Sequence, residues 1–361
     1  MTEKTKTATK KKATTKTKTY KKRVSEDGVE KKSFAEEVAE RLIAALEAGT
    51  APWQKPWKAG EPNGLMPFNP TTKERYKGIN SLVLMNQAMA KGYSDTRWMT
   101  FKQGLNIDAF VRKGEKGTQI QYWSFSKSKV RRDDNKEPIR DGDGKTIKDT
   151  IKFSRPMVTT AYVFNAEQID GLPELVRNPA PEAAWGQIER ADRIISASGA
   201  IILNDQEDRA FYRPSTDRIH MPGLAQFPEA SDYYAVLFHE LAHWSGSDKR
   251  LKRDLTGSFG SESYAREELR AEIASMIIGD ELGLGHNPDR HASYVQSWIK
   301  KLKEDPLEIF RAASDAEKIQ KFIFAFDPSL DDDHDLEADD PANLDHGYGE
   351  FANDWTSAPS L

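Results

Sequence analysis

Two histidines four residues apart, His239 and His243, constrain the fold of this chain more than any other feature. On an α-helix, residues at this spacing project from the same face, so both imidazoles can bind one metal ion. The surrounding sequence predicts such a helix over 231–245, with Ser231 as its N-cap and Gly246 after its end. An apolar stripe along this helix, typical of a helix packed on a core, consists of Tyr234, Leu237, Phe238 and Leu241.

Glu240 lies directly between the two histidines in the order His-Glu-x-x-His. In this pattern the histidines bind Zn²⁺, and the glutamate takes a proton from the attacking water and passes it to the leaving amine. The chain has no cysteine, so it forms no disulfide and a zinc ion must use His, Asp or Glu. The sequence therefore predicts a Zn²⁺ peptidase site. The alternative is a pair of surface histidines beside an acid, which a third ligand would disfavour.

A second predicted helix, over 262–282, supplies candidates for that third ligand. One stripe of this helix contains Tyr264, Glu268, Glu272 and Ser275. We expect Glu268 to be the ligand, and Glu272, one turn further on, to accept the free N–H of a ligating histidine. Glu267 is the alternative ligand, because it faces only about 100° away. Tyr264 is a candidate hydrogen-bond donor to the tetrahedral oxyanion, or else a packing residue.

The remaining periodicity predicts an α+β fold, because a few strands are followed mainly by helices. Further helices are predicted from Ser33 to Gly49 and over 79–90, 95–104, 186–198, 291–303 and 313–325. Strands are predicted over 118–125, 157–164 and 200–204, with a β-hairpin over 209–221 and a long hairpin or loose loop over 127–155. We expect one domain over 33–165, a proline-containing linker over 166–185 and a second domain over 186–326. His220, in the hairpin, is either near the site or an ordinary surface histidine.

The two ends of the chain have opposite charge and few apolar residues. Residues 1–32 contain eleven Lys and one Arg against four acidic residues, whereas residues 327–361 contain eleven acidic residues and no Lys or Arg. Both are predicted to be disordered, because neither can bury enough apolar surface to offset its ordering entropy. The basic head either contacts phosphates or is simply solvated, and the acidic tail either mimics DNA, shields the head or is solvated. Without a run of about eighteen apolar residues, the sequence predicts a cytoplasmic protein with no membrane partner.

The ordered motifs of the chain resemble the ArdC-like antirestriction proteins of plasmids and phages. In the C-terminal half the resemblance rests on AFYRPSTDRIHMP, FHELAHWSG, RLKRD, FGS, YAREELRAEIAS and SYVQSWIKKL. In the N-terminal half it rests on APWQKPW, NPTTKERYKGIN, WMTFKQ, VRKGEKGTQIQYW and VFNAEQIDGLP. It covers most of residues 34–325, without the two ends or the charged segment 127–155. The resemblance implies a domain that binds single-stranded DNA with little sequence preference, followed by a zincin-like metallopeptidase domain.

The N-terminal residue types agree with single-strand binding, which combines base-stacking aromatics with basic residues. We expect Trp53 and Trp57 to be stacking platforms, because they lie in an irregular stretch bounded by prolines. The alternative for each aromatic residue is a place in the core. The predicted phosphate contacts are the basic residues of two short loops, Lys73, Arg75 and Lys77 in the first and Lys113 and Lys116 in the second.

Three functions fit these observations. The first is an antirestriction-type protein that coats single-stranded DNA and carries a zinc peptidase-like domain. The second is a zinc protease that DNA binding directs to DNA-associated proteins, as in the SprT-like enzymes that the chain distantly resembles. The third is a DNA-binding protein whose zinc site is not catalytic. Glu240 argues against the third, since a structural zinc site needs no general base. The sequence does not identify the protein substrate.

Overall fold

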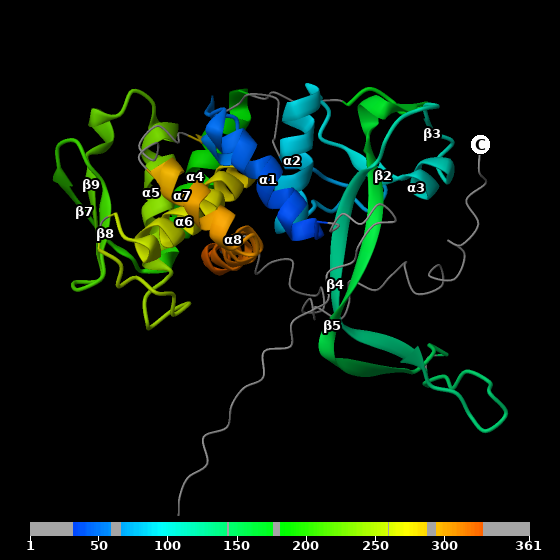
Figure 1. The fold of residues 1–361 in the computed structure, drawn as a ribbon. Helices are drawn as coiled ribbons and strands as arrows, with labels where there is room; N and C mark the ends of the chain where they lie inside the picture. The colour runs from blue at the N-terminus through cyan, green and yellow to red at the C-terminus, as the bar shows by residue number, and fades with distance from the viewer. Residues whose placement is uncertain are drawn as a thin grey trace, which may run out of the picture.

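The computed structural model describes residues 32–58, 66–142, 144–175, 181–258, 260–286 and 294–327. Within these residues the protein has the predicted α+β architecture: a helical body, a small mixed sheet at one end and a second sheet with a projecting hairpin at the other (Figure 1). The predicted disordered head and tail lie outside the described residues, apart from Lys32 and Asp327. In the described part of the chain, no helix is both long and apolar enough to span a bilayer.

The helical body forms around two packed helices, α5 (Ala230–Trp244) and α6 (Glu262–Leu282). Both present apolar residues to a common core, which includes Leu237, Leu241, Ile273 and Ile277, each at most 1% exposed. Three further helices pack around α6: α4 (Pro181–Ser198), α7 (Val295–Glu304) and α8 (Glu308–Phe324). The 3₁₀ helix η3 (Leu224–Gln226) precedes α5.

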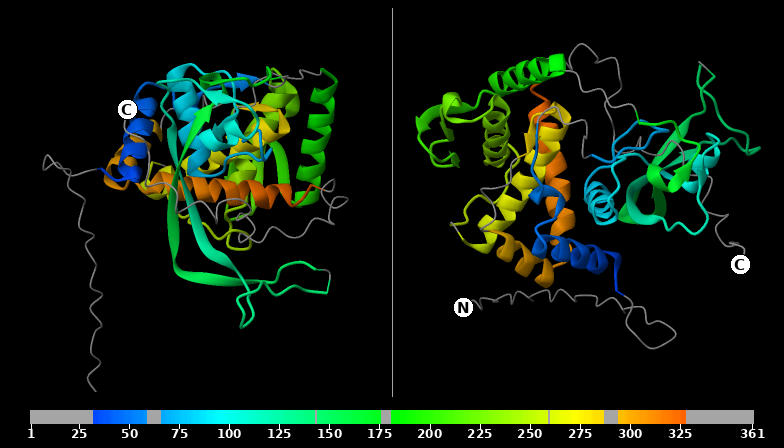
Figure 2. Two further views of the ribbon diagram at one scale, coloured as in Figure 1. Left: turned by 90° about the vertical axis from the view of Figure 1, so that its right-hand side faces the viewer. Right: turned by 90° about the horizontal axis from the view of Figure 1, so that it is seen from above.

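The first helix of the chain belongs to this same body. In α1 (Phe34–Glu47), the Ser33 hydroxyl accepts a hydrogen bond from the Glu36 backbone N–H, and the Glu36 carboxylate accepts one from the Ser33 backbone N–H, which forms a capping box. The helix packs along α7 (Figure 2), and Val38, Leu42 and Leu46 enter the core that α5 and α6 build.

The chain then crosses the body beneath α6. The 3₁₀ helix η1 (Pro52–Gln54) is followed by β1 (Trp57–Lys58), which pairs antiparallel with β10 (Gly285–His286). At Gly279 of α6 an added Cβ would collide with the Gly285 carbonyl oxygen, so the absence of a side chain lets β10 approach the helix. Residues more than 200 positions apart are thus joined in one core and one sheet.

The small sheet has the order β7–β9–β8, comprising β7 (Ile201–Gln206), β8 (Phe211–Arg213) and β9 (Arg218–Pro222). The predicted hairpin over 209–221 is confirmed as the antiparallel pair β8 and β9, while β7 runs parallel to β9. Strand β8 is therefore an edge strand, and it packs against α5. Arg250 fastens the β8–β9 turn to this helix by ion-pairing with Asp217 and donating to the Trp244 carbonyl at 2.6 Å.

The N-terminal sheet has the order β2–β5–β4, comprising β2 (Trp98–Thr100), β4 (Thr118–Val130) and β5 (Lys148–Asn165). One face packs on α2 (Ile79–Lys91) through a second core of Tyr76, Leu84, Trp98, Ile120 and Val163. The predicted alternatives for 127–155 resolve as a long hairpin, since β4 and β5 remain paired out to Val130 and Lys148. Beyond the body this hairpin forms a projecting arm (Figure 1).

A small cluster covers the other face of this sheet near β2. It contains α3 (Phe101–Leu105) and the two-stranded sheet of β3 (Phe110–Val111) and β6 (Ile169–Asp170), with η2 (Ala166–Gln168) leading into β6. Its core consists of Met99, Ala109 and Ile169.

Three local predictions were wrong. The helix predicted over 95–104 is a strand, β2, followed by the single turn of α3, because Trp98 and Met99 pair with β5 before Thr100 caps the helix. Ser231 is not the cap of α5, which begins one residue earlier after Glu229. The segment predicted as a linker contains β6, and its end from Pro181 onward belongs to α4; residues 176–180 lie outside the described part.

Candidate metal centre

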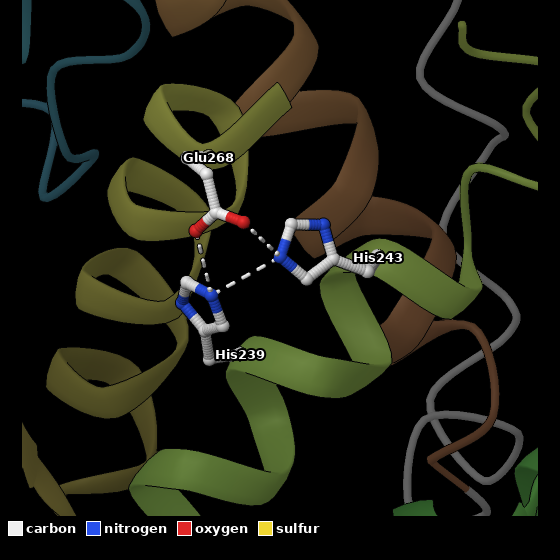
Figure 3. Close-up of side chains that lie close together, drawn as sticks. All are labelled: His239, His243 and Glu268. Atoms are coloured by element: carbon white, nitrogen blue, oxygen red, sulfur yellow. Dashed lines mark hydrogen bonds and ion pairs between the residues drawn. The ribbon is translucent and has the colours of Figure 1, made fainter. Parts of the chain in front are cut away.

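His239, His243 and Glu268 converge where α5 and α6 face each other (Figure 3). The Nε2 atoms of the two histidines are 3.1 Å apart, and a different carboxylate oxygen of Glu268 lies 3.5 Å from each. The four-residue spacing on α5 brings the imidazoles together as expected, and α6 supplies the carboxylate from the next helix.

These separations fit a bound metal ion. Ligands 2.0–2.2 Å from a tetrahedral zinc ion are about 3.4 Å from one another. The observed separations of 3.1 to 3.5 Å bracket that value. Two imidazoles and one carboxylate also form the donor set of catalytic zinc sites, in which the fourth position stays open to water.

Each of the two histidines has a carboxylate at its other ring nitrogen. Glu272 Oε2 lies 3.3 Å from His239 Nδ1, and Glu267 Oε1 lies 3.2 Å from His243 Nδ1. Such partners fix the tautomer and orientation of a metal-binding imidazole. Glu268, and not the alternative Glu267, thus completes the converging group, while Glu272 lies where it was expected. The role of Glu267 as a partner of His243 was not predicted.

In the metal-free protein, the surrounding carboxylates favour the protonated form of His239 and His243. Burial opposes the charge on His239, but hydrogen bonds with Glu268 and Glu272 outweigh it and raise the pKa of His239 well above its usual value. Burial likewise opposes the charge on His243, but Glu268 and Glu267 raise its pKa. The same negative charge of the carboxylates would favour a bound divalent cation.

Arg253 holds the carboxylate of Glu267 in place. Its Nη2 and Nε atoms donate to Glu267 at 2.7 and 3.0 Å, and a further hydrogen bond of 2.9 Å joins it to Ser245 Oγ. Burial disfavours the Glu267 carboxylate, yet the hydrogen bonds with His243 and Arg253 lower the pKa of Glu267. The carboxylate therefore remains charged in a buried position.

His286, which the sequence did not indicate, lies beside the carboxylate of Glu272. It is buried in β10; its Nε2 lies 2.9 Å from the Trp53 carbonyl oxygen, as a hydrogen-bond donor would, and 3.4 Å from Glu272 Oε1. A contact across 233 residues leaves no local pattern to find. His286 therefore connects the crossing segment η1 to the carboxylate behind His239.

The three converging side chains open into a cleft with a volume of about 370 Å³. Glu240 lines this cleft beside the histidines, as the predicted general base must. Tyr264 and Tyr294 line it as well, with ring centroids 5.6 Å apart. Burial, followed by the nearby charge of Glu268, raises the pKa of Tyr264, so its hydroxyl keeps its proton and can donate. Strand β8 forms one wall through Phe211 and Tyr212.

His220 belongs to the sheet behind that wall. It stacks on Phe211 with centroids 4.8 Å apart, and its Nδ1 is 2.9 Å from Asp205 Oδ2. It is buried, so the prediction of an ordinary surface histidine was wrong, and its contacts are with the sheet and not with the converging group.

Among the predicted DNA contacts, the structure contradicts three. Trp53 is 0% exposed in the main core, and Trp57 is half-buried on α6 next to Gly279, so neither is a stacking platform. Arg75 ion-pairs at 2.6 Å with both Glu281 and Glu317, which occupies its guanidinium. Pro52 lies in the buried part of this crossing segment, whereas Lys55 and Pro56 are exposed. The four predicted lysines, by contrast, are all exposed: Lys73, Lys77, Lys113 and Lys116.

Two histidines one turn apart, a glutamate from the adjacent helix and a glutamate beside them in an open cleft define a zincin-like domain. The family described as zincin-like metallopeptidase matches residues 189–315, and the family described as the N-terminal domain of anti-restriction factor ArdC matches residues 32–164. The chain is 36% identical to the metal-free antirestriction protein ArdC from the R388 plasmid, with a TM-score of 0.63 over 82% of this chain and 99% of the other. The Mn(II)-bound structure of that protein gives 35% identity and a TM-score of 0.62, over 83% and 100% of the two chains. The chain belongs to the ArdC-like antirestriction proteins.

Some relatives are much longer proteins, and this chain matches only a part of each. The chain is 59% identical to one Escherichia coli DNA primase TraC and 58% identical to another, over 81% of its own length in each case. It spans only 27% and 20% of those two relatives. It is also 38% identical to the protein y4eC of Sinorhizobium fredii, over 80% of this chain and 91% of that protein.

Proposed function

We propose that this chain is an antirestriction-type protein of a mobile genetic element that binds single-stranded DNA and hydrolyses peptide bonds at a zinc centre. The observation that carries the peptidase part is the convergence of His239, His243 and Glu268 in a cleft that also contains Glu240. The DNA-binding part is supported by the likeness of residues 32–164 to the N-terminal domain of ArdC.

In the proposed reaction, His239, His243 and Glu268 hold the metal ion. When bound, zinc acts as a Lewis acid on water and on the scissile carbonyl. Glu240 takes the proton of the attacking water and later delivers it to the leaving amine. The same carboxylate therefore acts first as a base and then as an acid. Tyr264, which is protonated and lines the cleft, donates a hydrogen bond to the oxyanion that forms on the substrate.

The geometry also favours an extended peptide as substrate. Strand β8 is the edge of its sheet and lines the cleft, so its free backbone groups can pair with a substrate strand. The adjoining Phe211 and Tyr212 offer apolar surface for substrate side chains. A purely structural metal site would require neither an open cleft nor Glu240.

A comparison of three proteins tests the proposal: wild type, Glu240→Gln and Glu262→Gln, which alters an exposed glutamate of α6 as a control. Zinc content, cleavage of an unfolded protein in the presence of single-stranded DNA, and protection of incoming DNA from restriction are measured for each. We expect Glu240→Gln to retain zinc and DNA affinity but to lose cleavage, with the control behaving as wild type. Equal cleavage by Glu240→Gln and wild type would refute the assigned chemistry.

The protection assay separates the two biological roles. If Glu240→Gln protects DNA as wild type does, coating of the strand carries the antirestriction function. If it loses protection while keeping zinc and DNA affinity, proteolysis of a DNA-associated protein carries it.

A further inference from the structure

The outer face of the projecting hairpin exposes large aromatic side chains. Directly paired residues of an antiparallel sheet lie on the same face, and the register pairs Trp123 with Val158 and Gln119 with Tyr162. Trp123 is 44% exposed, Val158 42% and Tyr162 52%. The alternate residues of β4 and β5 point the other way and pack on α2, so this face is distinct from the core face of the sheet.

A basic turn lies directly beside this face. An added Cβ at Gly117 would lie 3.1 Å from both the Tyr162 Cβ and the Phe164 ring, so the turn leading into β4 is packed closely on the aromatic strand. Lys113 and Lys116 in this turn are exposed and form no ion pair with any residue that the structure describes. Further along β4, Lys127 and Lys129 are exposed at alternate positions of the arm.

Two of the carboxylates near these lysines are paired with arginines. Arg112 Nη2 lies 3.0 Å from Glu115 Oε1, and Arg131 Nε lies 3.0 Å from Asp149 Oδ1. Lys113 and Lys116 are therefore the exposed cations of this turn that form no ion pair with a described residue. Aromatic surface bordered at both ends by exposed lysines is complementary to a strand of unpaired bases on a phosphate backbone.

We propose that this outer face of β4 and β5, with Trp123 and Tyr162 as stacking residues and Lys113 and Lys116 as phosphate contacts, is the surface that binds single-stranded DNA. This inference rests on the proposed DNA-binding function and assigns it a place. Trp123 is paired with Val158, and Tyr162 lies four positions further along β5, which is about 13 Å along the sheet. Each ring can therefore stack on a different base. The face replaces Trp53, which is buried, and Trp57, which is half-buried against α6.

The test measures binding of fluorescent oligo(dT) by anisotropy for wild type, Trp123→Ala, Tyr162→Ala and the double variant. Each single change should weaken binding about tenfold, because base–aromatic stacking contributes at this scale per base. Trp123→Phe should recover most of the affinity, because it keeps a ring. Leu224→Ala, which truncates an exposed apolar residue of η3, is the matched control and should bind as wild type.

An abasic strand of the same length distinguishes stacking from a general loss of structure. The alanine variants should bind this strand as wild type does, whereas Lys113→Ala with Lys116→Ala should weaken both ligands. Wild-type affinity of the double aromatic variant for oligo(dT) would overturn the location while leaving the DNA-binding function intact. Failure of the wild type itself to bind oligo(dT) would overturn the proposed DNA-binding function and this inference with it.

Discussion

Substitution of Glu267 by alanine tests the proposed metal centre, because there this residue acts on the metal only through other side chains. Its carboxylate contacts His243 Nδ1 at 3.2 Å and receives two hydrogen bonds from Arg253. The side chains of Glu267 and Arg253 are 8% and 9% exposed. Removing Glu267 therefore leaves a buried guanidinium without its counter-ion.

The cost of this change follows from the contacts that remain. Removing one partner of a buried ion pair costs about 3–5 kcal/mol. Arg253 keeps its hydrogen bonds to Ser245 Oγ and the Ala242 carbonyl, which compensate part of the loss. We therefore expect Glu267→Ala to lower the free energy of unfolding of the metal-free protein by about 3 kcal/mol, the lower end of that range.

The effect on the metal should be weaker than that of removing a ligand. Loss of the partner of His243 Nδ1 should reduce zinc affinity about 10- to 100-fold, whereas Glu268→Ala should abolish stoichiometric binding. Denaturant titration gives the free energy, and competition with a chromophoric chelator gives the affinity. Glu262→Ala, which removes an exposed carboxylate of the same helix, should change neither measurement.

Two results would refute this reasoning. Retention of zinc by Glu268→Ala together with its loss from Glu267→Ala would reverse the roles of the two neighbouring residues. An unchanged free energy of unfolding in Glu267→Ala would show that the buried ion pair with Arg253 contributes nothing.

Three further predictions follow from contacts already described. Trp53→Ala should lower the free energy of unfolding in denaturant by about 3–5 kcal/mol, as for a fully buried aromatic, without weakening oligo(dT) binding by the folded protein; weaker binding would restore its predicted role as a platform. The hydrogen bond from Arg250 lowers the pKa of Asp217, so the unfolded state binds more protons in acid and the pair loses its effect as pH falls below about 3.8. The melting temperature of wild type should therefore exceed that of Asp217→Asn by more at pH 7 than it does in acid below pH 3.8, and a constant difference would contradict this. Tyr264→Phe should lower kcat for peptide cleavage with little change in zinc content, and unaltered kcat would exclude the hydroxyl from the reaction.

The convergence of the candidate metal centre could be predicted from sequence because it depends on local helix geometry. The spacing of His239 and His243 fixes their common helix face, and the stripe on the next helix contains Glu268 and Glu272. The boundaries of α6 were also predictable, since its apolar periodicity runs from a serine cap to a left-handed glycine. Each of these features depends on residues of a single helix.

The long-range features could not be predicted in this way. Trp53 was expected on the surface because prolines surround it, but the chain crosses beneath α6 and buries it against residues more than 200 positions later. Arg75 belongs to a basic loop in sequence, yet Glu281 and Glu317 meet it in space. Charge and composition report which residue types are present; only the packing of distant elements decides which of them remain free.

The crossing of η1 and β1 beneath α6 also limits how this family can recombine. The carbonyl of Trp53 meets His286, β1 completes the sheet of β10, and α1 fills the core beside α7. A gene fusion that joined the residues from 186 onward to a new DNA-binding module would leave out a helix, a strand and a buried tryptophan of the peptidase body. The structural unit is therefore the chain from α1 onward, and a fusion that keeps the helical body intact is expected to keep the N-terminal sheet with it.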